Sequence, residues 1–398
     1  MSTGRALPAD PARVSELLRE LVAALHASGE LRSPEWHAAF MRVPRHAFVP
    51  RFFLDREHRG HFTPIDGINP AQHAEWLSKV YSNEPLITQI GGDDTAWTTA
   101  VETGSTGGVP TSSSTMPGLM ALMLEVLGIA GGMRVLEVGT GTGYNAALLC
   151  ERLGPEWVTS IDVDPLLVNA ARERLAALGY APALVAADGT LGHPAGAPYD
   201  RILVTVAVPQ IPRAWIEQTR EQGRILADIG SGALALLTVR NGAAEGHFLP
   251  DCRGFIPIRA ENARAALGLL QTADMTNSER RPAALDGHEL DDPTFRFLAT
   301  LRVPAHHVEL LPECGSRQFW LLGRDGSSWA CQATDDHGRS NVAQHGTHRL
   351  WDELEAAHRD WGTLGRPARE MFGLTVRQDG RHVLWCGEAG EHEWELPC

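Results

Sequence analysis

The stretch "RVLEVGTGTGYNAALLCERLG" (Arg134 to Gly154) decides the fold. It has the pattern of a β-strand, a turn rich in glycine and then a helix, which is typical of a nucleotide-binding unit. Its glycines stand at Gly139, Gly141 and Gly143, so the spacing is GxGxG. A dinucleotide fingerprint has the spacing GxGxxG, with the last glycine one position later. The turn therefore indicates a nucleotide-type cofactor and makes a dinucleotide less favoured.

Strand and helix patterns alternate on the C-terminal side of this stretch. A helical pattern covers "PLLVNAARERLAALG" (165–179). Further strand patterns are "EWVTSIDV" (156–163), "APALVAAD" (181–188), "YDRILVTVAV" (199–208) and "GRILADIG" (223–230). Such alternation predicts an α/β fold with a doubly wound, Rossmann-like parallel sheet, which binds ligands at the carboxyl ends of its strands.

The flanking regions have other patterns. Apolar residues at helical spacing predict one helix in 12–27 and a second in 33–50. Beyond residue 259 an amphipathic helix (349–365) lies between two segments, 319–334 and 372–387, that each carry an Asp-Gly hairpin signal. We therefore divide the chain into a helical, substrate-side segment (1–116), a cofactor-binding core (117–258) and an extra α+β domain (259–398), joined through a polar connection at 271–292.

Composition limits the classes of function. The chain has 398 residues, is 43% hydrophobic and has a formal net charge of −14. A negative chain with no stripe of Lys and Arg is a poor partner for nucleic acid, and no apolar run is long enough to span a membrane. Six cysteines stand without a CxxC pair, and the first 20 residues lack the apolar core of a signal peptide. We expect a cytoplasmic protein.

Three carboxylates stand at the ends of neighbouring predicted strands. They are Glu137 before the glycine turn, Asp162 about 20 residues later, and Asp188 after the third strand. A carboxylate at such a place accepts hydrogen bonds from ribose hydroxyls. Together the acids suit a cationic nucleoside without phosphates, a description that S-adenosylmethionine fits. Each acid alone could instead only cap the following helix.

Four segments carry a family resemblance. "TSSSTMPGLMALMLEVL", "LEVGTGTGYNAALL", "VTSIDVDPLLVNAARERLAALGY" and "ADGTLGHPAGAPYDRILVTVAVPQIP" resemble protein-L-isoaspartate O-methyltransferases over residues 34–258. The resemblance implies a class I methyltransferase that converts S-adenosylmethionine to S-adenosylhomocysteine without a metal. The cofactor-binding residues that we assign are Glu137, Gly139, Thr140, Gly141, Thr142, Gly143, Asp162, Val163, Asp188 and Gly189.

The resemblance also implies where the substrate binds. In this family a hydroxyl residue two positions before a proline contacts the substrate carboxylate, and that position, before Pro117, is Thr115. The usual residue there is Ser, so Thr115 is a departure that keeps the hydroxyl. Ser112, Ser113 and Ser114 either supply further hydroxyls or only belong to a flexible loop. Because the nucleophile is an anion and the leaving thioether is neutral, the reaction needs orientation more than a strong base.

The C-terminal part carries the segments "GSSWACQ", "RLWDELEAAHRDWGTLGRPAREMFGLTV" and "RHVLWCG". It resembles the extension of methyltransferases that accompany ATP-grasp peptide maturases. These enzymes act on ribosomally made, cross-linked peptides such as graspetides, with lanthipeptide and lasso peptide relatives. They esterify an ordinary Asp, and the following backbone nitrogen expels methanol to form an aspartimide. We therefore expect a macrocyclic precursor peptide as substrate. The alternative is repair of isoaspartyl residues, and a non-enzymatic peptide escort is a further hypothesis.

Two other patterns have ordinary explanations. His337, His345 and His348 with Asp335 and Asp336 match no zinc spacing, so we predict a polar loop and no metal. Tryptophans gather in the C-terminal part, where core packing is the first interpretation and a peptide-binding wall the second. The C-terminal domain itself either recognises the substrate or only dimerises or stabilises the fold.

Overall fold

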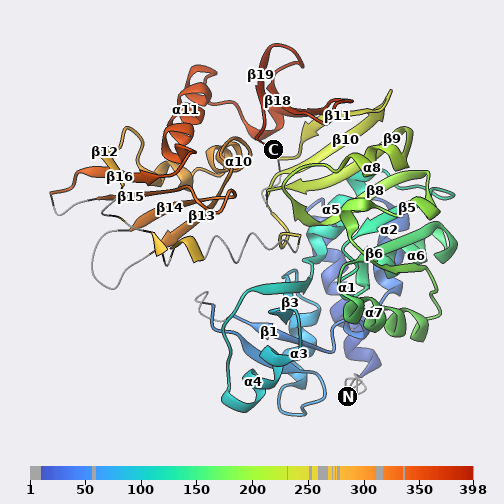
Figure 1. Cartoon of the computed structure of the whole chain (residues 1–398). Coiled ribbons are helices and arrows are strands. Elements are labelled where there is room, and N and C mark those ends of the chain that lie inside the picture. Colours follow the sequence, from blue (N-terminus) through green and yellow to red (C-terminus); the bar gives the residue numbers. More distant parts are fainter. Residues whose placement is uncertain are drawn as a thin grey trace. The chain divides into compact units, whose positions relative to one another are not determined.

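The computed structural model describes residues 10–55, 60–230, 232–250, 253–258, 268–270, 272, 273, 275, 278–310, 317–334 and 337–397. The chain forms two compact units (Figure 1). Unit 1 contains residues 1–206, 212–227 and 236–242. Unit 2 contains residues 207–211, 228–235 and 243–398. The division into three parts along the sequence remains a prediction.

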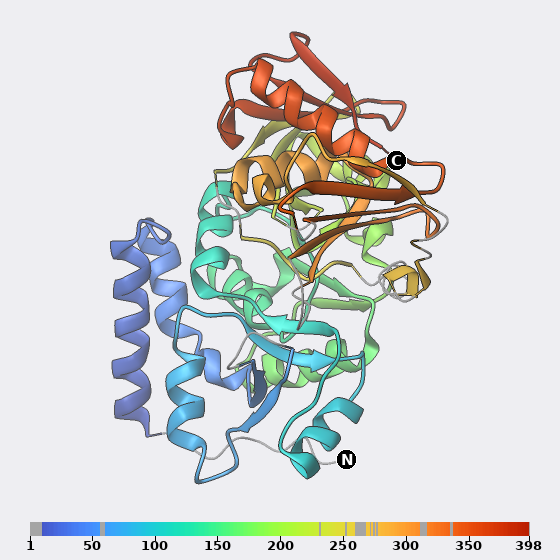
Figure 2. The same cartoon turned by 90° about the vertical axis from the view of Figure 1, so that its left-hand side faces the viewer.

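Unit 1 begins with the helices that the sequence predicts. Asp10 caps α1 (Pro11–Ala27) and Ser33 caps α2 (Pro34–Arg42), and each cap accepts a hydrogen bond from a backbone N–H of the first turn. A 3-10 turn, η1 (Arg45–Ala47), follows. The two helices pack against each other and against α5 (Pro117–Leu127), and Figure 2 shows them side by side at the edge of unit 1.

A small antiparallel sheet follows in the segment that the sequence left without strands. Its strand order is β2-β1-β3-β4. The strands are β1 (Arg51–Leu54), β2 (Thr63–Asp66), β3 (Leu86–Ile90) and β4 (Pro110–Ser114), with the helices α3 (His73–Val80) and α4 (Thr95–Thr103) between them. The predicted loop at Ser113 and Ser114 is wrong, because both residues lie in β4 and pair with β3. A serine-rich strand lacks the apolar alternation by which a sequence reveals a strand.

The predicted parallel arrangement is confirmed for β5, β6, β7 and β8, because β5 pairs in parallel with both β6 and β8, and β6 pairs in parallel with β7. The strand order in this part of the sheet is β10-β9-β8-β5-β6-β7. The strands are β5 (Val135–Val138), β6 (Val158–Asp162), β7 (Ala183–Ala186), β8 (Tyr199–Val208), β9 (Thr219–Ile229) and β10 (Leu234–Arg240). The helices of this part are α6 (Tyr144–Leu153), α7 (Pro165–Ala177) and α8 (Arg213–Gln218), besides α5. The carboxyl ends of β5, β6 and β7 therefore lie at one edge of the sheet.

Unit 2 combines strands and helices, as the sequence predicts. One run of strands has the order β11-β17-β18-β19, and a five-stranded sheet has the order β12-β16-β15-β14-β13. The first run comprises β11 (Ala243–Phe248), β17 (Phe372–Val376), β18 (His382–Cys386) and β19 (His392–Glu395). The second sheet comprises β12 (Glu279–Pro282), β13 (Ala305–Leu310), β14 (Gln318–Gly323), β15 (Trp329–Thr334) and β16 (Ser340–His345). Helices of this unit with described bounds include α10 (Pro293–Arg302) and α11 (Leu350–Thr363).

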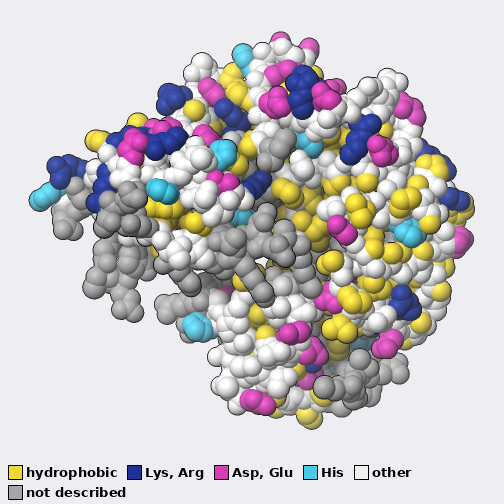
Figure 3. Space-filling model, viewed as in Figure 1, with side chains coloured by type: hydrophobic (Ala, Val, Ile, Leu, Met, Phe, Trp, Pro, Cys, Tyr) yellow, Lys and Arg dark blue, Asp and Glu magenta, His cyan; other side chains and the backbone are white. Residues whose placement is uncertain are grey.

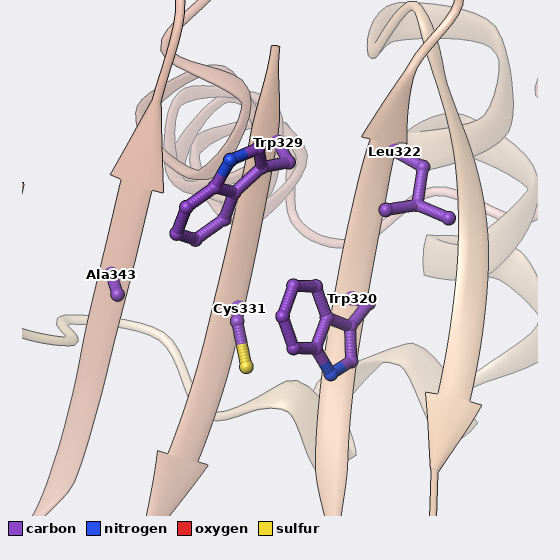
Figure 4. Packing of buried hydrophobic residues seen from close by; sticks show 5 residues of the cluster. All are labelled: Trp320, Leu322, Trp329, Cys331 and Ala343. Carbon is purple, nitrogen blue, oxygen red and sulfur yellow. The ribbon is translucent and has the colours of Figure 1, made fainter. Parts of the chain in front are cut away.

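The tryptophans of unit 2 belong to its core. Trp320, Trp329, Trp351, Trp361 and Trp385 are each at most 7% exposed. Figure 4 shows Trp320 and Trp329 on adjacent strands of the five-stranded sheet, where their ring centroids are 5.7 Å apart. Side chains two positions apart share one face of a strand, so Cys331 joins Trp329 in this cluster. Core packing, the first interpretation of these residues, is confirmed.

Two segments expected without regular structure contain strands. The predicted connection at 271–292 contributes β12, which pairs with β16. The predicted polar loop around His345 contains β16, whereas Asp335 and Asp336 lie outside the described residues. Both strands are rich in polar residues and are held by backbone pairing, so composition gave no strand signal.

Candidate functional site

The glycine turn between β5 and α6 has the backbone that its sequence requires. Gly139, Gly141 and Gly143 have φ values of +104°, +51° and +89°. These values are unfavourable for side chains other than glycine. A Cβ atom at Gly139 would also lie 2.6 Å from Thr205 Oγ1 of β8. The turn is therefore both left-handed and closely packed, which lets its backbone approach a ligand.

Glu137 supports this turn from inside the protein. Its side chain is 0% exposed, and its two oxygens accept hydrogen bonds from Asn145 Nδ2 at 2.6 Å and Ser160 Oγ at 2.5 Å. Ser160 Oγ in turn lies 2.6 Å from Thr140 Oγ1 in the turn. Burial raises the pKa of Glu137 to about 7, although both hydrogen bonds favour the charged form. Sequence reasoning missed Asn145 and Ser160, since neither stands out by type or spacing.

Asp162, at the end of β6, shapes two loops at once. Its Oδ2 accepts a hydrogen bond from Gly141 N at 2.9 Å, and its Oδ1 accepts one from Asp164 N at 3.0 Å. Asp164 caps α7 by accepting from Leu166 N. Asp162 therefore holds the glycine turn through a hydrogen bond, and its side chain is half-buried beside that turn.

Asp188 and Gly189 follow β7. Asp188 is exposed and caps the short η3 turn (Gly189–Leu191), where its Oδ1 accepts from Thr190 N at 2.9 Å. Gly189 is packed against β5, because a Cβ atom there would lie 2.6 Å from Val138 Cγ1. Asp188 therefore has the capping role that the sequence analysis gave as an alternative for a strand-end acid. The side chain of Asp188 is nevertheless exposed to solvent.

Exposed apolar side chains lie next to these polar groups. Val163 is 47% exposed, and Leu166 and Leu191 are each 64% exposed. Apolar surface with a few convergent polar groups suits a flat base and its ribose. The segments 139–143, 162–166 and 188–191 contain no Lys or Arg. This donor set lacks the cations expected around a polyphosphate and fits a cationic nucleoside such as S-adenosylmethionine.

The hydroxyl residues of β4 lie beside the glycine turn. A Cβ atom at Gly141 would be 3.6 Å from Ser113 O and 3.7 Å from Ser112 Oγ, an ordinary van der Waals contact. Thr115 directly follows β4 and is half-buried. Within the described residues, no hydrogen bond engages the hydroxyls of Ser113 and Thr115. Ser114 differs, since it is 2% exposed and its Oγ accepts from Arg45 Nε at 3.3 Å.

Gln89 joins the paired strands β3 and β4 to the end of β6. It is 7% exposed, donates from Nε2 to Asp164 Oδ2 at 3.0 Å, and accepts from Thr111 Oγ1 at 2.8 Å. Sequence reasoning missed Gln89, because a polar residue inside a short strand gives no signal of its partner. Through Asp164 and Asp162, a continuous set of hydrogen bonds runs from Gln89 in β3 to the glycine turn.

The charged and metal-binding groups of the described residues add no second site. No group of three or more His, Cys, Asp or Glu side chains among them is arranged to hold a metal ion. On the face shown in Figure 3, Lys and Arg side chains are scattered, with Asp and Glu beside them. No helix in the described part of the chain is both long and apolar enough to cross a membrane.

Comparison with known proteins agrees with this geometry. A family model described as Protein-L-isoaspartate(D-aspartate) O-methyltransferase (PCMT) matches residues 84–258. A protein-L-isoaspartate O-methyltransferase of Ignicoccus hospitalis is 34% identical over 212 residues, which are 53% of this chain and 80% of the relative. A second such enzyme, from Archaeoglobus fulgidus, is 39% identical over 230 residues, covering 56% of this chain and 85% of the relative.

A solved structure titled protein-L-isoaspartate O-methyltransferase has a similar fold. It aligns with a TM-score of 0.53 and 23% identity, covering 93% of this chain and 100% of its own. Fold and site together define a class I methyltransferase that uses S-adenosylmethionine to methylate a carboxylate. The chain belongs to the protein-L-isoaspartate O-methyltransferase family.

Proposed function

We propose that the chain methylates an aspartate-type carboxylate of a peptide or protein, with the isoaspartyl residue as the first candidate. The observation that carries the proposal is the close approach of β4, with its hydroxyl residues, to the glycine turn. The names of the relatives favour the isoaspartyl substrate over the ordinary Asp that the C-terminal resemblance suggests.

The proposed roles on the substrate side follow from the available hydroxyls. Bound S-adenosylmethionine supplies a methyl group on a cationic sulfur. Thr115 donates a hydrogen bond to one oxygen of the substrate carboxylate, which turns the other oxygen toward the methyl group. Ser113 is a second donor, whereas Ser114 acts through the backbone because its hydroxyl is bound to Arg45. Since the nucleophile is already an anion, correct orientation supplies most of the rate increase.

On the cofactor side we assign Asp162 to the ribose hydroxyls and Val163 to one face of the base. Asp188 and Gly189 border the base at the end of β7. The glycine turn, with Thr140 and Thr142, lies along the methionine part. Glu137 acts indirectly, because its side chain is 0% exposed and its oxygens accept hydrogen bonds from Asn145 and Ser160, whereas Asp162 is only half-buried. The role of Glu137 is to keep the turn in the conformation that the cofactor needs.

A second candidate substrate is an ordinary Asp in a constrained, cross-linked peptide. The length of the chain favours it, because the family match ends at residue 258 and unit 2 adds a five-stranded sheet beyond that point. A constrained loop loses less conformational entropy on binding than a linear peptide. On the other hand, a solved structure that aligns with 93% of this chain is also named protein-L-isoaspartate O-methyltransferase.

One experiment separates the two candidates. The purified chain receives labelled S-adenosylmethionine and three peptides of one sequence, carrying linear isoaspartate, linear Asp or Asp within a macrocycle. Preference for isoaspartate supports the first candidate. Preference for the macrocyclic Asp, followed by loss of methanol, supports the second. Methylation of none of the three, or equal methylation of linear Asp, contradicts the proposal.

A further inference from the structure

Arg45 lies directly behind the hydroxyl segment of β4. It is the first residue of η1, and its side chain is 0% exposed. Its guanidinium makes six hydrogen bonds of 2.9–3.3 Å, all to neutral oxygens. The acceptors are Val80 O, Ser82 O, Glu84 O, Ser114 O, Ser114 Oγ and Thr115 O. One side chain therefore joins the end of α3 to the end of β4.

Within the described residues, the charge of Arg45 has no paired carboxylate. No ion pair of the described residues includes Arg45, and the nearby carboxylate of Glu84 pairs with Lys79 at 2.9 Å. Burial lowers the pKa of Arg45 to about 10, so the group still carries its positive charge at neutral pH. A buried cation is costly unless it is hydrogen-bonded or paired. Here five carbonyl oxygens and one hydroxyl oxygen accept the hydrogen bonds of Arg45 without neutralising its positive charge.

The segment that carries Arg45 also touches the cofactor side. A Cβ atom at Gly143 would lie 3.6 Å from Phe48 Cδ1, and the ring of Phe48 is 5.8 Å from that of Tyr144. His46 Nδ1 lies 2.6 Å from Tyr81 Oη, which anchors η1 to the residue after α3. Arg45 is thus held on a short segment that contacts both the glycine turn and β4.

We propose that Arg45 is a positioning residue for methyl transfer, which fixes the main chain of Ser114 and Thr115 and sets a positive charge behind the substrate carboxylate. The inference rests on the proposed function of Thr115. Removing the Arg45 guanidinium would let the Thr115 hydroxyl move away from the substrate carboxylate, while the cofactor-binding residues would be little changed. A lysine at this position keeps the charge but not the geometry of a guanidinium.

The test compares the full chain with Arg45→Lys, Thr115→Val and the double variant, using the peptide that the wild type methylates best. We expect Arg45→Lys to lower kcat about 10- to 100-fold, with the Kd of S-adenosylmethionine within about threefold by calorimetry. If Arg45 acts through Thr115, the double variant loses at most about threefold more than Thr115→Val alone, because effects that act as a unit do not add.

Arg369→Lys is the matched control. Arg369 is 5% exposed in unit 2 and also donates to backbone oxygens, those of Gly232 and Pro293. It should change thermal stability without this loss of kcat. If Arg45→Lys does not fold, Ser114→Ala removes only the Nε acceptor and should lower kcat about threefold.

The outcomes separate the two hypotheses. Three results overturn the role of Arg45 alone. The first is a double variant whose loss of kcat is the product of the two single losses, and the second is an unchanged kcat in Arg45→Lys, or in Ser114→Ala where that variant replaces it. The third is a rise in the Kd of S-adenosylmethionine as large as the fall in kcat. Full turnover by Thr115→Val overturns the assignment of Thr115 and with it the inference. A wild type that methylates no carboxylate overturns the proposed function itself.

Discussion

The two sides of the candidate site are built with opposite charges. On the cofactor side, Asp162 accepts hydrogen bonds from backbone N–H groups of the glycine turn and of the loop before α7. On the substrate side, Arg45 donates to backbone carbonyls at the ends of α3 and β4. Each loop is held through its main chain by a charged side chain of unit 1.

The difference matches the charges of the two proposed ligands. The cofactor is a cation, and the carboxylates Asp162 and Asp164 lie on its side. The substrate carboxylate is an anion, and the only charge hydrogen-bonded to the backbone of Ser114 and Thr115 in the described structure is the Arg45 guanidinium. Charges in a partly dehydrated site interact more strongly than in water. The charged side chain that fixes each loop is therefore also opposite in sign to the ligand proposed to bind at that loop, and favours its binding.

The largest expected effect concerns Glu137, the most buried acid of the cofactor side. The pKa of Glu137 is about 7 in the native state, above the ordinary value of 4.5. Between pH 4.5 and 7, the native state therefore keeps a proton on Glu137 that the unfolded state has lost. Stability therefore falls as pH rises from about 4.5 to about 7, by roughly 3 kcal/mol at 1.36 kcal/mol per pKa unit. Glu137→Gln should remove this fall. Urea unfolding of both proteins at pH 4.5 and 7.5 measures it, and parallel pH dependence would contradict the prediction.

On the substrate side, Thr115→Val should lower turnover and leave cofactor binding nearly unchanged. One hydrogen bond to a charged group contributes about 1.5 to 3 kcal/mol, which corresponds to about 10- to 150-fold in kcat. Thr115→Ser keeps the hydroxyl and should be nearly silent. Methyl transfer at saturating S-adenosylmethionine tests the assignment. If Thr115→Val keeps full turnover, Ser113 becomes the first candidate.

Asp162→Asn should show the reverse pattern. The amide retains the shape but loses the charge and one of the two acceptors for the N–H groups of Gly141 and Asp164. We therefore expect the Kd of S-adenosylmethionine to rise about tenfold, or about 1.4 kcal/mol, with kcat little changed. Calorimetry gives the Kd and saturating turnover gives kcat. A fall in kcat without a change in Kd would show that the two sides of the site are not separate in function.

The smallest effect is expected where the two sides are joined. Gln89→Met removes the hydrogen bonds to Asp164 and Thr111 and should raise the KM of the peptide about fivefold, close to 1 kcal/mol. Thr111→Val keeps the bond from Gln89 to Asp164 and removes the bond to Gln89, together with the one that Thr111 Oγ1 accepts from Gly92 N, so it should have a smaller effect on the KM of the peptide. Steady-state kinetics with both variants measures the contribution, and equal KM values in all three proteins would rule out this connection.

The parallel sheet could be predicted because its signals are local. The strand before Gly139, the glycine spacing and the strand-helix alternation all lie within short stretches of chain. The same locality gave the hairpins β14–β15 and β17–β18, each with an Asp-Gly turn, and the buried tryptophans. Polar strands such as β4, β12 and β16 escaped prediction, since backbone pairing holds them and composition does not mark it.

The sequence by itself determined the class of fold, the position of the glycine turn and a set of carboxylates and hydroxyls near it. Only the tertiary structure decided what each group faces. It turned Glu137 inward to Asn145 and Ser160, and it brought Arg45 to Ser114 and Thr115 across 69 and 70 positions of the chain. The physical reason is that a buried charge is stabilised by partners from distant segments, and such partners leave no periodic pattern in the sequence.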